Sequence, residues 1–464
     1  MYSTICEMIP YDADYSERTR QLAIYQKLLD GSFYDVLPYE FHEERNASGE
    51  YIPLRQRKPS VRYGLARLVV EDSVALLFSE GHFPAFDSPD PDVRDALAAV
   101  VRDARLNTVM VEAGLRGSIG SVALLLRILR GRVFIDVLDS LYLWPEWAAD
   151  EPDMLCRVTE RYKVSGANLA AQGYTIEDTG ATYWFQRVWD TEYERWFEPA
   201  LLGVINRPLE DPVRTIRHGL GFVPVVWIKN LPGGKAIDGA CTFRSSIDTS
   251  IEIDYQLSQA GRGLKYSSDP TLLIREPAGV DRNLVRGAAN ALVVSEKGDA
   301  KLLEIGGTAS QAVIDYVRIL RDLALETLHG NRAEANRLTA PASGRALQLM
   351  NQGLLWLADN LRISYGQGAL LTLAHMIVRA SQVYQLRVSG GIIGSLSDRA
   401  AISLRWPNWY PDDALDAQRT AETLISLVGA KQMSRETALR VLAAEYDIED
   451  IAAELQRIKT EEVE

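Results

Sequence analysis

The residues of this chain most suited to chemistry lie between positions 142 and 198, where tryptophans and acids are concentrated. They are Trp144, Trp147, Trp184, Trp189, Trp196, Asp190, Glu192 and Glu194. Aromatic platforms that stack a sugar ring, together with paired carboxylates for acid and base work, are what a carbohydrate-active enzyme needs. The other interpretation is a β-domain that fills its core with Trp and Tyr. No carboxylate pair stands in a recognisable catalytic frame, so the sequence favours core packing.

The familiar cofactor and metal motifs are incomplete in this sequence. Gly234-Lys235 is followed by Ala236, where a nucleotide-binding P-loop needs Ser or Thr. His42-Glu43-Glu44 lacks the second histidine of a zinc-protease motif, and Gly117-Ser118-Ile119-Gly120 places its serine one position early for a hydrolase elbow. We therefore predict no catalytic activity, no cofactor and no metal. A carbohydrate-active enzyme or binding module built on 142–198 remains the alternative.

Composition limits the classes of partner. The 464 residues include 50 Lys and Arg against 63 Asp and Glu, a net charge of −13, whereas proteins that grip nucleic acid are normally basic. The first thirty residues are too charged for a signal peptide, and no apolar run is long enough to span a bilayer. Cys6, Cys156 and Cys241 are widely separated, which favours a reducing compartment. These features predict a soluble intracellular protein.

The elements that would position any site begin with an α+β N-terminal half. Apolar residues at helical spacing predict helices over 16–30 and 60–79. Residues 120–140 predict a strand, a turn at Gly131 and a second strand. Short aromatic-rich runs between 155 and 230, separated by turns such as Asp178-Thr179-Gly180, predict an antiparallel meander.

Two rod-like helices follow, with a small β insert between them. The first spans 244–264, with Ser245 and Ser246 as candidate caps, and ends at Ser268-Asp269-Pro270; 271–305 predict short strands. The second spans 308–329 and opens with Thr308 and Gln311 at capping-box spacing. Its apolar stripe comprises Val313, Tyr316, Val317, Leu320, Leu323, Ala324 and Leu328.

The C-terminal part begins with a loop, 331–342, that is longer than a simple helical connection requires. Its arginines could meet a phosphate backbone, or the loop could be a solvated linker. From Ser343 a long helical pattern reaches about Leu386, and its glycines predict a kink or break. A strand at 401–405 and three short helices near 412–428, 434–445 and 449–461 complete the chain.

This order of elements resembles the portal proteins of long-tailed bacteriophages. The stretches that carry the resemblance are His218 to Val226 with Asn230, Ile253 to Ser258 with Ser268-Asp269-Pro270, Ala342-Ser343-Gly344-Arg345-Ala346-Leu347, and Trp406-Pro407 through Asp412-Asp413 to Ser434-Arg435-Glu436-Thr437-Ala438. The likeness covers nearly the whole chain. Each motif alone is weak, and their order and spacing are more specific.

The resemblance implies a ring, usually of twelve copies, at one capsid vertex, through which double-stranded DNA is packaged and ejected. The fold class is then α+β with an α/β wing, a two-helix stem, a β-rich clip and a helical crown. The implied parts are wing 1–243 and 343–410, stem helices 244–266 and 308–330, clip 267–307, tunnel loop 331–342 and crown 411–464. Net acidity suits a conduit, because an acidic lining repels phosphate. A non-ring scaffold or adaptor protein is a competing class.

The resemblance also implies sites and partners. The tunnel loop would touch DNA without sequence preference through Asn331, Arg332, Asn336 and Arg337. The clip, with Arg275, Arg282 and Arg286, would dock the terminase large subunit and later a head-completion adaptor. Major capsid and scaffolding proteins would be further partners. The implied location is the portal vertex of the virion, after assembly in the host cytoplasm.

Overall fold

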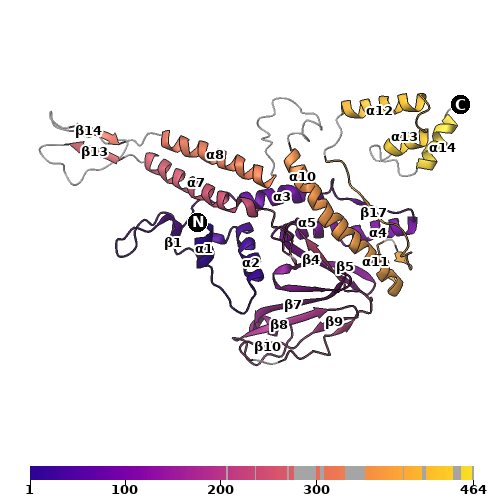
Figure 1. Cartoon of the computed structure of the whole chain (residues 1–464), viewed down its shortest axis with the longest axis horizontal. Coiled ribbons are helices and arrows are strands. Elements are labelled where there is room, and N and C mark those ends of the chain that lie inside the picture. The colour runs from indigo at the N-terminus through magenta and orange to yellow at the C-terminus, as the bar shows by residue number, and fades with distance from the viewer. Residues whose placement is uncertain are drawn as a thin grey trace. The chain divides into compact units, whose positions relative to one another are not determined.

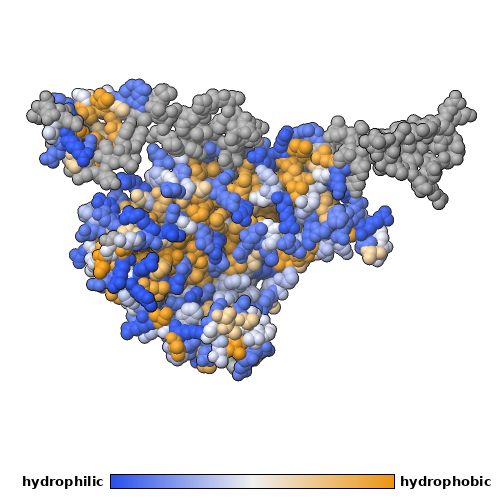
Figure 2. All heavy atoms as spheres, turned by 180° about the vertical axis from the view of Figure 1, so that it is seen from behind, coloured by the Kyte–Doolittle hydropathy of each residue, from blue (hydrophilic) through white to orange (hydrophobic). Residues whose placement is uncertain are grey.

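The computed structural model describes residues 1–204, 207–235, 237–268, 271–275, 299–303, 308–329, 351–389, 391–409, 414–442 and 451–461. Helices and antiparallel sheets occur together, which confirms the α+β class. The chain divides into a larger unit, Met1–Arg332 with Gly353–Pro407, and a smaller unit, Ala333–Gln352 with Asn408–Glu464. On the face of the larger unit seen in Figure 2, hydrophobic residues gather across the middle, with hydrophilic residues around them.

A three-stranded sheet of order β12-β4-β5 lies at the centre of the larger unit (Figure 1). Its strands are β4 (Ser121–Leu129), β5 (Arg132–Asp139) and β12 (Val225–Lys229). The first six residues of β4 are buried, as expected of a strand covered on both faces. The predicted strand–turn–strand over 120–140 is confirmed, and Gly131 lies in the turn with φ +80°.

The aromatic-rich region forms a second, antiparallel sheet, and the predicted meander is confirmed. Its main path has the order β11-β9-β8-β7-β6, and β10 pairs with β8. The strands are β6 (Leu143–Trp147), β7 (Leu155–Ser165), β8 (Thr182–Trp189), β9 (Tyr193–Trp196), β10 (Ala200–Leu201) and β11 (Ile216–Arg217). Trp189, Leu143 and Val158 pack against residues of β4 and β12, which joins the two sheets through one core.

The described α-helices of the N-terminal half are α1 (Tyr2–Met8), α2 (Glu17–Leu29), α3 (Leu65–Phe78), α4 (Pro91–Asp103), α5 (Leu106–Gly117) and, between β7 and β8, α6 (Gly166–Ala171). Of these, α5 packs on β4 and β5 of the central sheet, while α3 and α4 pack on α5. The side chain of Ser16 caps α2 by accepting from the N–H of Thr19, and the helix predicted over 16–30 is confirmed. The helix predicted at 60–79 begins only at Leu65, because residues 61 and 63 instead give backbone N–H groups to α7.

The two rods form an antiparallel helix pair that we call the stem pair. It consists of α7 (Ile247–Ser268), which follows the 3₁₀ turn η4 (Arg244–Ser246), and α8 (Thr308–Leu328). The helices pack along each other, and the end of α8 contacts η4 at the start of α7. Between them in sequence, β13 (Thr271–Arg275) pairs with β14 (Asp299–Leu303). The amide of Gln311 donates to the carboxylate of Asp315 at 3.0 Å, and the side chain of Thr308, the other half of the predicted capping box, lies outside the described residues.

A long helix returns over the central sheet and changes its winding where the sequence predicts a break. It comprises α10 (Gln352–Leu361), the π-helical segment η6 (Arg362–Leu371) and α11 (Thr372–Val383). Gly366 and Gly368 both lie in η6. The helix ends before the predicted Leu386, which opens the hairpin of β15 (Leu386–Val388) and β16 (Gly391–Ile393).

The remaining strands are short. β17 (Ser403–Arg405), within the predicted 401–405, pairs with β3 (Ala85–Asp87), and β1 (Tyr39–Glu40) pairs with β2 (Arg57–Lys58). Further 3₁₀ turns are η1 (Phe33–Val36), η2 (Leu54–Gln56) and η3 (Ser140–Tyr142). In the part of the chain that is described, no helix has both the length and the hydropathy to cross a bilayer.

The smaller unit contains the three predicted C-terminal helices. They are α12 (Ala414–Gly429), α13 (Arg435–Leu442) and α14 (Ile451–Glu461), and neighbours in sequence contact each other. The hydroxyl of Ser434 accepts from the N–H of Thr437 at 3.1 Å, so α13 starts at the serine that the sequence indicates.

Candidate functional site

The most informative surface among the described residues is α8, which has three distinct faces. Ala324, Leu325 and Leu328 are almost fully buried and hold the helix on the larger unit. The predicted apolar stripe is split: Val313, Val317 and Leu320 are half-buried, whereas Tyr316 and Leu323 are exposed. Burial inside one chain therefore explains only part of the stripe.

The second face is an exposed apolar stripe. Tyr316, Ile319 and Leu323 expose 44%, 57% and 53% of their surface, and their i, i+3, i+7 spacing places them in one row along the helix. Isolated exposed apolar residues are ordinary, but a continuous row on a rigid helix is typical of a surface that another protein covers. We call these three residues the stem stripe.

The third face is acidic and lies directly beside the stem stripe. Asp315, Asp322 and Glu326 are exposed at positions four and seven residues apart, which aligns them along the helix. Arg318 lies in the same row and its guanidinium is 3.3 Å from the carboxylate of Asp315. The row carries three acids against one arginine, so a ligand that runs along it meets net negative charge.

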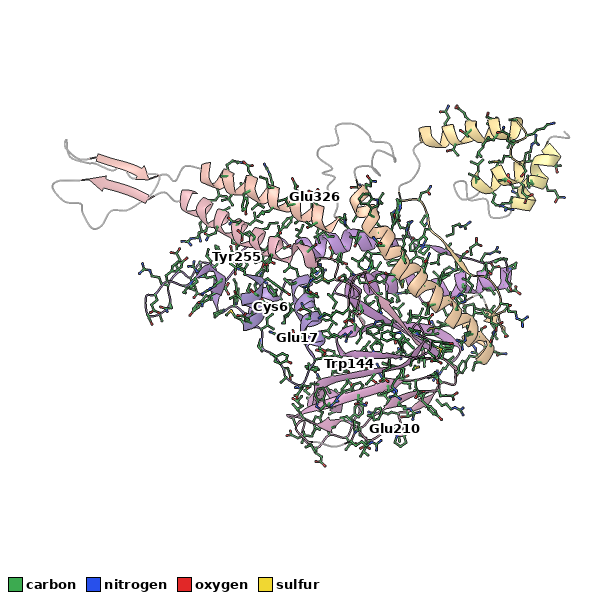
Figure 3. All side chains as sticks on the ribbon, viewed as in Figure 1. Cys6, Glu17, Trp144, Glu210, Tyr255 and Glu326 are labelled. Atoms are coloured by element: carbon green, nitrogen blue, oxygen red, sulfur yellow. The ribbon has the colours of Figure 1, made fainter. Side chains whose placement is uncertain are left out.

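The other helix of the stem pair is held by buried polar contacts with the N-terminal segment. The carboxylate of Asp254, 7% exposed, accepts from the hydroxyl of Tyr34 and from the backbone N–H of Tyr63, both at 2.7 Å. One turn later, the hydroxyl of Ser258 accepts from the N–H of Val61 at 3.0 Å. Tyr255, labelled in Figure 3 together with Glu326 of α8, donates to the carbonyl of Arg57 at 2.8 Å. These bonds fix the position of α7.

Burial is the main influence on the pKa of Asp254. It raises the pKa of Asp254 above its ordinary value, while the hydrogen bonds from the Tyr63 N–H and the Tyr34 hydroxyl oppose the shift. Burial and the adjacent carboxylate also raise the pKa of the Tyr34 phenol, which therefore stays a donor. Burial thus favours protonated Asp254 by more than the two hydrogen bonds favour the carboxylate.

Asp254→Asn is expected to become more stable relative to the parent as pH rises from about 4 to 7. Because the folded-state pKa lies above the ordinary 3.8, the stability that protonated Asp254 contributes is complete below pH 3.8 and is lost as pH rises through the raised value. Asparagine can accept from Tyr63 and donate to Tyr34 at every pH. Urea unfolding at several pH values checks this, with the exposed Asp322→Asn as control; an unchanged difference across the range would contradict it.

A buried asparagine connects the start of the stem pair to the long helix. The side-chain amide of Asn230 donates to the carbonyl of Ala240 at 2.9 Å and to the hydroxyl of Thr242 at 2.8 Å. Its carbonyl oxygen accepts from the hydroxyl of Tyr365 in η6 at 3.2 Å. Asn230 is 1% exposed, so these bonds form away from water. One side chain thus joins β12, the segment before α7, and the π-helical turn.

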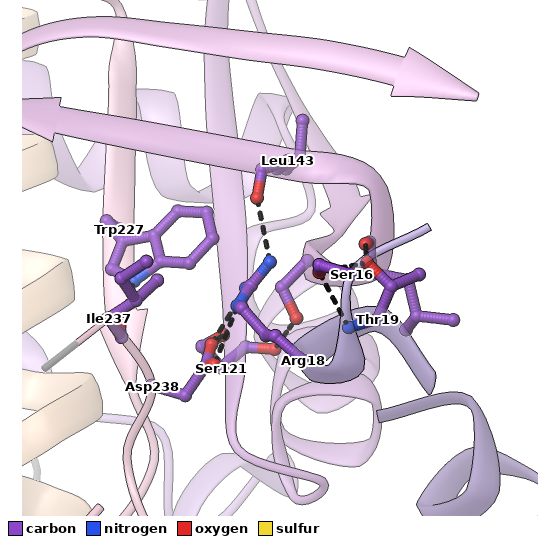
Figure 4. Close-up of polar contacts among 10 residues, drawn as sticks. Ser16, Arg18, Thr19, Ser121, Leu143, Trp227, Ile237 and Asp238 are labelled. Carbon is purple, nitrogen blue, oxygen red and sulfur yellow. Dashed lines mark hydrogen bonds and ion pairs between the residues drawn. The ribbon is translucent and has the colours of Figure 1, made fainter. Parts of the chain in front are cut away.

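A second buried cluster fixes the loop between β12 and α7 (Figure 4). The guanidinium of Arg18 grips the carboxylate of Asp238 with two bonds, 2.7 and 2.8 Å, and donates to the carbonyl of Leu143 at 3.0 Å. The hydroxyl of Ser121 donates to the same carboxylate. Trp227 donates to the carbonyl of Ile237 at 2.9 Å. The bidentate pair ties α2 to the chain that enters the stem pair.

The π-helical segment fits closely against the end of the larger unit. A Cβ on Gly366 would lie 2.8 Å from a ring carbon of Trp406, so only glycine allows this approach. The guanidinium of Arg362 stacks 4.6 Å from the centre of the Trp406 ring, and burial lowers the pKa of Arg362 to about 10. The break in the helix therefore has a packing cause, namely the insertion of Trp406.

The Trp-rich region uses its acids in ion pairs with arginines. Glu160 and Glu194 both pair with Arg187, whose guanidinium lies 4.3 and 4.8 Å from the rings of Trp189 and Trp196. The carboxylate of Asp190 pairs with Arg195 at 2.8 Å, and that of Glu192 with Arg217 at 2.9 Å.

Two carboxylates of these ion pairs, Glu160 and Asp190, have shifted pKa values. Burial raises the pKa of Glu160, and Arg187 opposes the shift. Burial also acts to raise the pKa of Asp190, but hydrogen bonds from Arg195 and two backbone N–H groups outweigh it and lower the pKa overall. A lowered pKa suits a structural carboxylate and not a general acid. These contacts favour the packing interpretation of the region, in which Trp144 also lies; Glu210, outside it in sequence, pairs with Arg195 (Figure 3).

The predicted site residues fall mostly outside the described residues. This holds for Asn331, Arg332, Asn336 and Arg337 of the tunnel loop and for Arg282 and Arg286 of the clip. Arg275 is the last residue of β13 and pairs in register with Asp299. The sequence does not single out Ile319, and it places Asp254 and Asn230 only within stretches that resemble portal proteins, without their buried contacts. Helical spacing from Tyr316 to Leu323 could have identified Ile319, whereas the other two depend on contacts that the sequence does not show.

Comparisons with known proteins return structures and no sequence relative. No protein-family model matches the chain, and no curated protein matches it. Solved structures that are similar include a chain from the virion of a native gene transfer agent particle, 12% identical, covering 82% of this chain and 88% of that chain with a TM-score of 0.37.

Two further similar structures come from necks of the same kind of particle. A neck of the native particle computed with C12 symmetry is 12% identical over 82% of this chain and 91% of that chain, with a TM-score of 0.39. A neck of the empty particle computed with C6 symmetry is 11% identical over 82% and 88%, with a TM-score of 0.37. The chain is thus similar, over most of its length, to chains of gene transfer agent virions and necks.

Proposed function

We propose that this chain is the subunit of a ring-shaped phage-type portal through which double-stranded DNA is packaged and ejected. The observation that carries the proposal is the pair of adjacent exposed stripes on α8, one apolar and one acidic. The portal resemblance of the sequence supports it independently. The protein has no catalytic role in this proposal, and the energy for DNA movement comes from a separate terminase.

The two stripes suit two neighbours that a ring provides. Copies related by rotation meet through unlike surfaces, so each subunit covers the stem stripe of the next and the ring closes when the rotation is complete. In this arrangement the neighbouring subunit covers the apolar row, and the acidic row faces the channel. A channel wall with net negative charge repels phosphates, so DNA passes without sticking.

The β13–β14 hairpin supplies the proposed docking surface. It is inserted between the two rods in sequence. The clip to which it belongs contains both arginines and acidic residues. Mixed charge suits exchangeable partners, first the terminase large subunit and then a head-completion adaptor. Capsid and scaffolding proteins are the remaining proposed partners, and the capsid vertex is the proposed location.

Replacing both Arg332 and Arg337 by alanine should leave ring assembly intact and change packaging efficiency or the retention of packaged DNA. A few arginine–phosphate contacts would be weak and strongly salt-dependent, as a passage requires. Replacement by glutamate should reduce packaging further, because it adds repulsion. Filled-capsid yield and DNA retention measure the effect. If both variants fill capsids and hold DNA like the parent, the segment 331–342 is an ordinary connector.

Electron micrographs of the purified protein test the proposal. Closed rings of uniform size over a range of concentrations are the expected result. Monomers or open filaments would count against it. A monomer that binds or cleaves a glycan would instead support the alternative, a carbohydrate-active protein built on 142–198.

A further inference from the structure

A cluster of exposed arginines and aliphatic residues lies where two β-hairpins of the larger unit meet. The β4–β5 turn accepts a hydrogen bond from the second hairpin, from the N–H of Arg387 to the carbonyl of Gly131 at 2.7 Å. Arg132 and Arg387 line one shallow pocket there, together with Asp103. The group that we call the hairpin patch consists of Leu129, Arg130, Arg132, Arg387 and Ile392.

Each hairpin contributes the same combination of side chains. Leu129 is the cross-strand partner of Arg132, and Ile392 is the cross-strand partner of Arg387. Cross-strand partners point to the same face, so each hairpin places an aliphatic residue beside a guanidinium. Leu129 and Ile392 expose 48% and 64% of their surface. Such neighbours would make a surface that is both apolar and positively charged.

The arginines of the hairpin patch form no ion pair among the described residues, although the charge of Arg132 adds to the effect of Ser389 in lowering the pKa of Asp103. Other exposed arginines do form ion pairs, for example Arg67 with Glu71 and Arg440 with Glu436. The nearest acid of the pocket, Asp103, instead accepts from the N–H and hydroxyl of Ser389, both at 2.6 Å. Three exposed arginines thus lie at one place in a chain of net charge −13.

The backbone at the tip gives a second, independent indication. Arg130 and Gly131 have φ of +52° and +80°, which is the two-residue turn that favours Asn-Gly. Arginine is strained at the first of these positions, where asparagine fits better. Strain that a common substitution would relieve points to a use for the side chain itself.

We propose that the hairpin patch binds an extended, acidic segment of a partner protein that also carries apolar side chains. Arginine pairs with carboxylates through two hydrogen bonds, and exposed Leu and Ile provide apolar contacts that a DNA backbone could not use. Among the described residues β16 pairs only with β15, so its other edge can accept a strand from the partner. This site is separate from the stem pair and does not depend on ring formation.

The test uses the full-length protein and a fluorescein-labelled peptide of about twelve residues that repeats Glu-Glu-Val-Val, so that each face of the extended peptide carries both Glu and Val. Fluorescence anisotropy should show saturable binding that weakens as salt increases. The variant Arg130→Asn/Arg132→Ser/Arg387→Ser should bind at least about tenfold more weakly, and Ile392→Ser should also bind more weakly. The single change Arg130→Asn should raise the unfolding temperature and reduce binding, which separates the role of the charge from that of the fold.

The matched control is Arg67→Ser/Arg440→Ser/Arg457→Ser, which removes as many exposed positive charges elsewhere on the chain. It should bind the peptide like the parent. Absence of binding to the parent would overturn the proposal, as would equal binding by the patch variant. Tighter binding of a short DNA duplex, lost in the patch variant, would also overturn it, because the patch would then be a nucleic-acid site.

Discussion

Replacing Ile319 and Leu323 by aspartate is expected to leave the protein folded and to prevent ring formation. Both side chains are more than half exposed in the isolated chain, so the change should alter the free energy of unfolding by no more than about 0.5 kcal/mol. In a ring the same positions would be buried, and each unpaired buried charge costs several kcal/mol. This cost recurs at every interface, so assembly should fail completely and not gradually.

Light scattering of the purified variant measures the effect. The matched control is Gln311→Asp/Arg318→Asp, which adds the same number of carboxylates to the neighbouring acidic row, where both residues are exposed. The control should assemble like the parent. Assembly of the Ile319→Asp/Leu323→Asp protein into particles of parental mass would show that the stem stripe is not the interface.

Asn230→Ala should produce the largest loss of stability, about 3–5 kcal/mol. The change removes the donors to Ala240 and Thr242 and leaves the hydroxyl of Tyr365 buried without its acceptor. Each buried polar group left without a partner costs about 1–3 kcal/mol. The midpoint of urea unfolding, at unchanged slope, reports the loss.

Tyr365→Phe is the matched control for this prediction. It removes only the bond to the Asn230 carbonyl and leaves the amide donors in place, so the expected loss is about 1–2 kcal/mol. The double variant should cost less than the sum of the two single changes, since both remove the same bond. Strict additivity would contradict the assignment of Asn230 as the link between the stem pair and the long helix.

Local sequence patterns predict helices and hairpins well where the apolar residues repeat with the period of a single helix or strand. Ser16 and the apolar residues after it define α2, and the glycines of 362–371 mark the π-helical break. The sequence analysis does not predict α4 and α5. For α4 a helix-start signal exists, because Asp90 is the N-cap and Pro91 the first helical residue. The helical period over 60–79 predicts α3 correctly but places its first residue too early, because residues before Leu65 donate hydrogen bonds to α7.

The candidate site was less predictable for a physical reason. Periodicity shows that Tyr316 and Leu323 belong to an apolar stripe, but it cannot tell whether the covering surface comes from the same chain or another. Asp254 and Asn230 lie in stretches that resemble portal proteins, but their structural roles are not predictable because their partners lie far away in sequence. The arginines of the hairpin patch belong to no sequence motif, and only the fold brings the two hairpins together.

The mass of the native particle tests the central proposal most directly. Light scattering coupled to size-exclusion chromatography, or native mass spectrometry, measures it without a partner or DNA. A ring of about twelve copies predicts one discrete species near 600 kDa. A species of 51.7 kDa, the mass of one chain, at every concentration tested would contradict the portal account.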